Sequence, residues 1–266
     1  MAKTKATYVC TDCGSEYSRW LGQCSDCKAW NTISEFRQAK LPARGGNFSG
    51  FAGTTQNDEA KVQTLNAIDL ADLPRFSSGF VEFDRVLGGG IVPGSAILIG
   101  GEPGAGKSTL LLQTMCTLAS NMPALYITGE ESLQQVAMRA KRLNLPTDKL
   151  KMLSETSVEN ICHIALKEQP KIMVIDSIQV MHMSDIQSAP GSVSQVRESA
   201  AYLTRFAKQY HVAILLVGHV TKDGSIAGPK VLEHCIDCSI MLEGSTDSRY
   251  RTLRGNKNRF GAVNEL

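Results

Sequence analysis

The stretch G-E-P-G-A-G-K-S-T at residues 101–109 decides the fold, because it matches the P-loop spacing G-x-x-x-x-G-K-[ST] at every required position. An apolar, β-prone run precedes it, and a helix is expected to start near Lys107. Glycines let the backbone turn with its N–H groups pointing inward, where the helix dipole adds positive potential. On this pattern Lys107 reaches the β- and γ-phosphates of ATP or GTP, and the Ser108 hydroxyl completes a Mg²⁺ shell. The alternative is a glycine-rich turn that binds nothing. The residues predicted to bind the nucleotide are Gly101, Glu102, Pro103, Gly104, Ala105, Gly106, Lys107, Ser108 and Thr109.

Composition and charge set the broad class of the protein. The 266 residues are enough for one large domain and a small one, and the net charge of +2 argues neither for nor against nucleic acid. No run of 18 apolar residues is present, and residues 1–7 lack the apolar segment of a secretory signal. We therefore expect a cytoplasmic protein with no membrane partner, whose eight cysteines do not form disulfides.

Four cysteines near the N-terminus have the spacing of a metal site. Two C-x-x-C pairs separated by ten residues can surround one Zn²⁺ tetrahedrally, and so short a segment buries too little apolar surface to fold without a metal. Two redox-active pairs are the alternative. We expect Trp20 and Trp30 to pack in the core of this finger, although stacking on nucleic-acid bases is a second possibility. The predicted zinc ligands are Cys10, Cys13, Cys24 and Cys27.

The other four cysteines are interpreted as core thiols. Cys235 and Cys238 form a third C-x-x-C within an apolar stretch, residues 235–242, that we expect to be a buried strand. Cys116 and Cys162 fall on helical patterns. The segment between the finger and the P-loop domain is rich in Gly, Thr and Asn and is typical of a linker. The predicted organisation is a zinc finger over residues 1–37, a flexible linker over 38–63 and a nucleotide-binding domain over 64–266.

Strand and helix patterns alternate along the nucleotide-binding domain. Such alternation predicts an α/β fold with a mostly parallel sheet, helices on both faces and ligands at the carboxyl ends of the strands. A hairpin of residues 237–242 and 249–253 is expected to follow. The predicted strands cover residues 96–100, 124–128, 151–153, 171–176 and 212–217, and the predicted helices cover 108–120, 132–142, 157–167 and 192–209.

Acidic residues stand where two of these strands end. Asp176 closes an apolar strand, the form of a second nucleotide-binding motif in which the acid holds Mg²⁺ through water. Glu130 and Glu131 follow another strand, and one of them is expected to orient or deprotonate the attacking water, with Glu130 preferred. Helix capping by these glutamates is the alternative.

Several motifs together resemble the bacterial RadA, or Sms, family of RecA-superfamily DNA-repair ATPases. They are the four-cysteine finger, S-S-G-F-V-E-F-D-R-V-L-G-G-G-I-V-P-G-S (77–95), the P-loop, T-G-E-E-S (128–132), G-H-V-T-K-D-G (218–224) and K-N-R-F-G (257–261). The resemblance covers essentially the whole chain and implies a RecA-like P-loop core. Members of the family usually continue into a Lon-protease-like domain, which we expect this chain to lack.

The resemblance also implies an activity and partners. It implies a hexameric ring, similar to a replicative helicase of the DnaB type, that hydrolyses ATP on single-stranded and branched DNA. This ring would extend recombination intermediates by branch migration and work beside a RecA-type recombinase. The cofactors are then ATP, Mg²⁺ and Zn²⁺. A KaiC-like switch, in which ATP controls assembly without DNA movement, is the alternative. A metabolic P-loop kinase is not supported, because no lid-like arginine cluster is present.

By the same resemblance, Lys257 and Arg259 reach the γ-phosphate in a neighbouring subunit as trans fingers. Independently of it, five cations fall within eleven residues, which is an unusual excess in a nearly neutral chain. One alternative is a charged hairpin that only faces solvent. Another is that part of the cluster, with Arg254 as the candidate residue, contacts DNA.

One strand end and the loop behind it complete the predicted site. His219 ends a strand beside the nucleotide, where it can sense the γ-phosphate. The following loop, residues 221–230, is rich in glycine, carries Lys222 and Lys230, and resembles the DNA-binding loop of RecA-like motors. Such lysines would grip the DNA backbone without sequence specificity. An ordinary surface loop is the alternative.

Overall fold

A seven-stranded sheet built from the apolar runs of the sequence forms the centre of the molecule. The structure is a computed structural model in which residues 7–10, 15–36, 64, 75–219, 229–244 and 250–263 are described. The sheet has the order β10-β9-β4-β8-β7-β5-β6, and β10 pairs antiparallel to β9 whereas all other pairs are parallel. This confirms the predicted α/β fold with a mostly parallel sheet. The strands are β4 (Ala96–Gly100), β5 (Ala124–Thr128), β6 (Lys151–Ser154), β7 (Ile172–Asp176), β8 (Ala213–Val217), β9 (Cys238–Glu243) and β10 (Thr252–Asn258).

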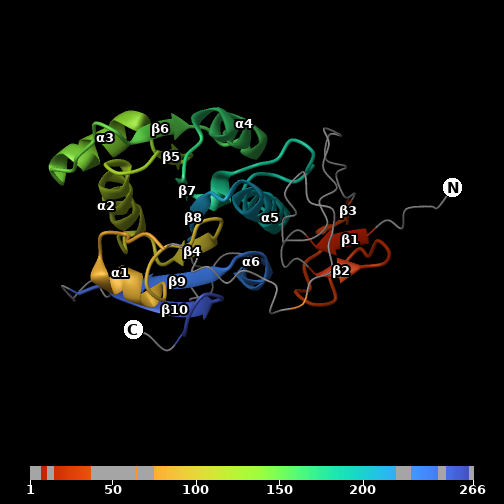
Figure 1. Cartoon of the computed structure of the whole chain (residues 1–266). Coiled ribbons are helices and arrows are strands. Elements are labelled where there is room, and N and C mark those ends of the chain that lie inside the picture. Colours follow the sequence, from red (N-terminus) through yellow and green to blue (C-terminus); the bar gives the residue numbers. More distant parts are fainter. Residues whose placement is uncertain are drawn as a thin grey trace.

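Helices cover both faces of the sheet, as parallel strands require. Successive residues of a strand point to opposite faces, so Leu98 of β4 joins one apolar core and Ile99 joins the other. Figure 1 shows α1, α2 and α3 on one side and α4, α5 and α6 on the other. The helices are α1 (Val81–Val86), α2 (Lys107–Ala119), α3 (Leu133–Arg142), α4 (Val158–Glu168), α5 (Val193–Tyr210) and α6 (Pro229–Cys235), with a short 3₁₀ helix η2 (Ile178–Val180) after β7.

The strand register brings the predicted site residues to one edge of the sheet. Thr128 at the end of β5 lies opposite Asp176 at the end of β7, and Ile99 of β4 lies opposite Val217 of β8. The loops that follow these four strands therefore leave the sheet side by side. They carry the P-loop, Glu130, Ser177 and His219.

The C-terminal hairpin differs from its predicted form. Cys235 belongs to α6 rather than to a strand, because the apolar run is broken at Asp237 and only Cys238 onwards pairs with β4. The second strand is β10, which begins at Thr252 and extends to Asn258. The predicted strand at residues 249–253 was therefore placed too early, and Lys257 lies within the sheet.

The N-terminal ribbon is a separate three-stranded antiparallel sheet of β1 (Thr7–Cys10), β2 (Glu16–Tyr17) and β3 (Ile33–Phe36), in the order β2-β1-β3. The expectation that its tryptophans pack in the core was wrong. Trp20 is 56% exposed and Trp30 is 68% exposed, because the small core is filled by other side chains. These are Cys10, Cys24 and Ile33, with Tyr8, Tyr17 and Leu21 packed against them.

Within the described residues, no helix combines the length and the apolar character needed to cross a membrane.

Candidate active site

The P-loop turns between β4 and α2 as its glycines require. Gly101 has φ 155°, and a Cβ atom there would lie 2.5 Å from the carbonyl oxygen of Leu242, so a side chain has no room. Gly104 and Gly106 have φ of 81° and 105°, in the left-handed region that glycine adopts without strain. Gly106 is also the N-cap of α2, so the N-terminus of this helix opens onto the loop. The arrangement is an anion site of backbone N–H groups and a helix dipole.

Lys107 is buried at the base of this loop, with only 4% of its surface exposed. Its Nζ donates hydrogen bonds to the carbonyl oxygens of Gly101 at 2.7 Å and of Glu102 at 2.9 Å. Burial lowers the pKa of the Lys107 ammonium, and the negative charges of Asp176 and Glu130 oppose that shift. The lysine therefore lies within the field of both acids that the sequence predicted to serve the same site.

Asp176 is a buried carboxylate whose hydrogen-bond partners are neutral hydroxyls. The Tyr126 hydroxyl on β5 donates to its Oδ2 at 2.5 Å, and Ser108 at the start of α2 forms a second hydrogen bond. Burial raises the pKa of Asp176, while both hydrogen bonds oppose the rise. A buried carboxylate beside a serine hydroxyl is a pair of hard oxygen donors, which is the set that Mg²⁺ prefers. The residues present therefore fit this ion.

Glu130 and Glu131 have different partners, although they are adjacent in the chain. Glu130 accepts hydrogen bonds from the Ser177 hydroxyl and, at 3.1 Å, pairs with Nε2 of His219. The bond to His219 is the largest influence that lowers the pKa of Glu130, and the Ser177 bond and the Lys107 charge act in the same direction. Glu131 instead forms an ion pair with Arg139 on α3. Of the two carboxylates, that of Glu130 is bonded to residues that follow β7 and β8, whereas that of Glu131 is paired with a helix.

The Lys257 ammonium and Arg259 lie at the opposite end of the sheet from this chain's own P-loop. The end of β10 is beside Cys238, which pairs with Ile97 near the start of β4, whereas the P-loop follows the end of β4. The five residues of β4 separate the two places by roughly 16 Å, which is beyond the reach of one side chain. Lys257 donates to the carbonyl oxygens of Glu233 and, at 2.8 Å, of Ile236 at the end of α6. Burial lowers the pKa of Lys257, and the neighbouring Arg259 charge adds to this.

The three predicted DNA contacts are not brought together by the described residues. Arg254 on β10 is exposed and pairs with Glu243 on β9 at 3.0 Å. Lys230 is the second residue of α6 and so lies in a helix instead of a loop. Lys222 lies outside the described residues, as does most of the loop that was expected to bind DNA.

Three of the predicted zinc ligands converge in the ribbon. The sulfur atoms of Cys10, Cys24 and Cys27 all lie within 4.8 Å of one another, and the Cys10 and Cys27 sulfurs are 3.6 Å apart. Tetrahedral zinc with bonds of about 2.3 Å places its sulfurs roughly 3.8 Å apart, so the cluster fits this ion. Cys13, the fourth predicted ligand, lies outside the described residues.

The cysteines of the nucleotide-binding domain are buried thiols, as the sequence indicated. Cys116, Cys162, Cys235 and Cys238 are all at most 7% exposed. Burial raises the pKa of each of them, for Cys238 to about 12. A protonated thiol is a poor metal ligand and a poor nucleophile, so these cysteines act as small core residues.

Sequence reasoning missed the residues that hold the acids in place. Ser177 and Tyr126 contact Glu130 and Asp176 through their hydroxyls, and Arg139 draws Glu131 away. A signal for Tyr126 was present, because a tyrosine in an otherwise apolar, fully buried strand must find a partner for its hydroxyl. Ser177 and Arg139 gave none, because their partners depend on which strands are neighbours.

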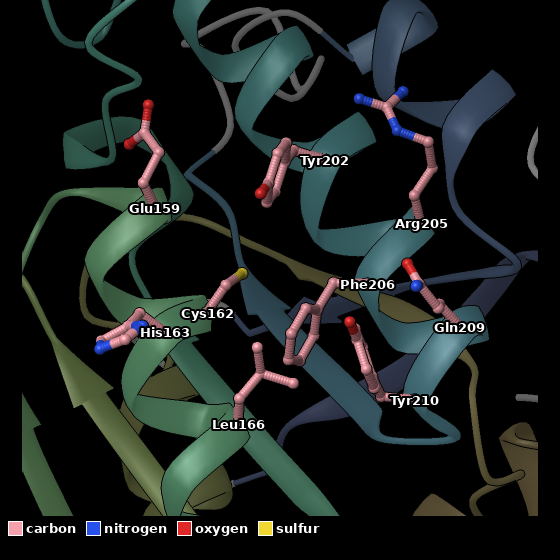
Figure 2. Close-up of a pocket in the computed structure, with 9 residues that line it drawn as sticks. All are labelled: Glu159, Cys162, His163, Leu166, Tyr202, Arg205, Phe206, Gln209 and Tyr210. Atoms are coloured by element: carbon pink, nitrogen blue, oxygen red, sulfur yellow. The ribbon is translucent and has the colours of Figure 1, made fainter. Parts of the chain in front are cut away.

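A pocket of about 190 Å³ opens between α4 and α5. Figure 2 shows Tyr202, Phe206 and Tyr210 of α5 on one side of it and α4 on the other. None of its lining residues belongs to the predicted site. They are Glu159, Cys162, His163, Leu166, Tyr202, Arg205, Phe206, Gln209 and Tyr210.

Comparison with known proteins agrees with this geometry. The family model described as AAA domain matches residues 71–225, which is more than half of the chain. The chain belongs to the AAA domain family. A second model, described as rubredoxin metal binding domain, matches residues 8–35 and so contains all four predicted zinc ligands.

Several similar relatives are DNA repair proteins named RadA. The whole chain is 71% identical to the protein from Escherichia coli K12, 58% identical to that from Pseudomonas aeruginosa and 48% identical to that from Bacillus subtilis. The resemblance to the RadA family is thereby confirmed. The chain spans 58% of the length of each of these relatives.

A solved structure supports the fold. A KaiC-like protein from Pyrococcus horikoshii OT3 superimposes with a TM-score of 0.61 over 73% of this chain and 93% of that protein, at 20% sequence identity. This likeness concerns the fold alone.

Proposed function

We propose that the chain is the ATP-hydrolysing part of a ring-shaped DNA repair motor that binds Mg²⁺ at its nucleotide site and Zn²⁺ in its ribbon. The observation that carries the proposal is the convergence of Lys107, Asp176 and Glu130 at one edge of the sheet, with Glu130 linked to His219. The similarity to RadA proteins supports DNA repair as the process.

Each residue of the site has a task that follows from its position. The P-loop N–H groups of residues 101–109 and the α2 dipole bind the phosphates, and Lys107 neutralises charge on the β- and γ-phosphates. Ser108 and Asp176 would hold Mg²⁺, which supplies further positive charge at the phosphates when bound. Tyr126 keeps one oxygen of Asp176 in place.

Glu130 acts on the attacking water. Its lowered pKa keeps it ionised at neutral pH, so it can accept a hydrogen bond from water and orient it toward the γ-phosphate. His219 and Ser177 fix its carboxylate, and His219 would report the presence of the γ-phosphate to the loop that follows β8. Glu131, paired with Arg139, is assigned no chemical role.

Completion of the site needs a second subunit. Lys257 and Arg259 are at the opposite end of the sheet from this chain's P-loop, so cations of this motif that reach a γ-phosphate must reach one bound by a neighbour. We propose a hexameric ring in which every interface joins one P-loop to the K-N-R-F-G motif of the next protomer. Hydrolysis then depends on assembly.

The motor would act on single-stranded and branched DNA in the cytoplasm, with a RecA-type recombinase as its partner. Lys222, Lys230 and Arg254 are the proposed phosphate contacts, and the proposed activity is that of a helicase that drives branch migration. The zinc finger, residues 1–37, is proposed to be joined by the linker, 38–63, to the ATPase domain, 64–266.

The test is the rate of ATP hydrolysis with and without single-stranded DNA. We expect DNA to raise the rate, and Lys107→Ala to abolish it in both conditions, because the loop then lacks its fixed cation. A rate that DNA does not change, together with ATP-dependent assembly, would instead favour a KaiC-like switch.

A further inference from the structure

Asp237 is a buried carboxylate at the point where α6 ends and β9 begins. It is 1% exposed. Its backbone N–H donates to the carbonyl oxygen of Ala96 at 2.9 Å, and its Oδ2 accepts from the N–H of the same residue at 3.0 Å. Ala96 is the first residue of β4, an interior strand that pairs with β8 and β9. The carboxylate is therefore held by the backbone of an interior strand and has little freedom to move.

The other oxygen of Asp237 is shared by two cations of different character. Lys208 in the last turn of α5 donates to Oδ1 at 2.8 Å, and Arg259 donates to the same atom through Nη1 at 3.3 Å. The Lys208 side chain is 20% exposed, whereas that of Arg259 is 46% exposed. Lys208 thus neutralises the carboxylate from the interior. Arg259 approaches it from the surface.

Arg259 is held at two points by the same residue. Besides the guanidinium contact, its backbone N–H donates to the carbonyl oxygen of Asp237 at 3.0 Å. The first contact fixes one edge of the guanidinium and the second fixes the backbone from which the side chain leaves. Because a guanidinium is a planar fork with five N–H donors, a single anchored edge leaves the others pointing in a defined direction.

The simplest alternative is that Asp237 and its cations only stabilise the fold. Lys208 already provides the short, mostly buried ion pair that a buried carboxylate needs. The contact of the half-exposed Arg259 adds little to stability, because solvent screens it. Arg259 is a second cation, fixed at two points on the surface side. Its anchoring is better explained if the guanidinium must point in one direction.

We propose that Asp237 is a positioning residue that aims the Arg259 guanidinium at the nucleotide of a neighbouring subunit. This inference rests on the proposed trans role of Arg259. Lys257 supports the same arrangement from the other side, because its ammonium binds the end of α6 one residue before Asp237. The C-terminus of α6, Asp237 and Arg259 then form one rigid platform at the amino end of β4.

The test compares Asp237→Asn with the matched control Lys208→Gln. Both variants break the Lys208–Asp237 ion pair, and we expect Lys208→Gln to lose at least as much stability in thermal unfolding, because it leaves the buried carboxylate without its nearest cation. Asparagine can still accept from Ala96 but no longer attracts Arg259. A displacement of about 1 Å at a reacting centre costs about 10²-fold in rate, so we expect Asp237→Asn to lower kcat by about this factor with an unchanged KM for ATP. Lys208→Gln should retain kcat.

Mixing of variants separates a positioning role from a structural one. A protomer in which only Arg259 is missing or misdirected still has an intact P-loop. Asp237→Asn mixed with Lys107→Ala should therefore regain activity, because the Lys107→Ala protomer supplies a correctly aimed Arg259. Asp237→Asn mixed with Arg259→Ala should stay inactive, because neither protomer supplies one.

The outcomes distinguish this inference from the function on which it rests. If Arg259→Ala and Lys107→Ala do not complement each other in mixed oligomers, the trans role itself fails. If they do, but Asp237→Asn keeps its full rate or shares its defect with Lys208→Gln, only the role of Asp237 is overturned.

A second variant covers the case in which Asp237→Asn does not fold. Arg259→Lys keeps the charge, but a single ammonium cannot both hold Oδ1 and extend outward. We expect it to be as slow as Asp237→Asn and to be rescued by Lys107→Ala. A wild-type rate for Arg259→Lys would refute the proposal.

Discussion

At the scale of single residues, two adjacent glutamates allow a direct test of the site. Glu130→Gln should bind ATP but hydrolyse it about 10²- to 10⁴-fold more slowly, because the amide cannot act as a base toward water. The matched change Glu131→Gln removes only a partly exposed pair with Arg139, so it should cost at most about 1 kcal/mol of stability and leave kcat nearly unchanged. Single-turnover hydrolysis and nucleotide binding measured on both variants check this. The reverse pattern would transfer the role to Glu131.

The same pair shows how far sequence reasoning reached at this scale. The position of both glutamates after an apolar strand was enough to place them at the carboxyl edge of the sheet. The choice between them depends on Ser177 and Arg139, which come from other elements and meet these glutamates only after the strands have paired. The local sequence pattern predicts at which end of a strand a side chain lies. The residues that the side chain contacts depend on the order of the strands in the sheet.

At the scale of elements, strand identity was predictable but strand ends were not. β4, β5, β7 and β8 are fully buried apolar runs bounded by turn residues, so pattern alone located them. β10 is mostly polar and only partly buried, and its limits depend on pairing with β9 rather than on its own composition. The prediction that the ribbon tryptophans are buried was wrong for a related reason. A core of three strands is too small to enclose them, and no local pattern states how large a core is.

The ribbon provides a prediction about metal removal. Cys27→Ser should release zinc and unfold the ribbon, because Cys10, Cys24 and Ile33 are too small a core to hold it folded without the ion. ATP binding should persist if the linker separates ribbon and ATPase domain as proposed. The matched control is Cys116→Ala in α2, which should leave the zinc content of the protein unchanged. Elemental analysis and nucleotide titration measure both effects. Absence of zinc from the unmodified protein, purified under reducing conditions, would refute the metal site.

At the scale of the whole molecule, the proposed trans arrangement assigns the two ends of the sheet to different halves of one active site. The P-loop lies at the carboxyl end of β4, and Arg259 is anchored to its amino end through Asp237. While β10 stays paired with β9, Arg259 and this chain's P-loop remain at opposite ends of β4. We therefore expect a single protomer to bind ATP but to hydrolyse it slowly, because its transition state would lack the outside cation that such fingers provide, an effect of about 10³- to 10⁵-fold in P-loop NTPases.

This geometry predicts that hydrolysis per protomer depends on protein concentration. Below the assembly threshold the rate should be low although ATP is bound, and it should rise and level off as rings form, with DNA shifting the rise to lower concentration. Arg259→Ala should assemble over the same range but stay slow throughout, because only charge stabilisation in the transition state is lost. Hydrolysis rates per protomer and native mass spectra, measured over the same range of protein concentration, test this for both proteins. A rate per protomer that stays constant while the oligomeric state changes would place the complete site within one chain and would contradict the separation that β4 imposes.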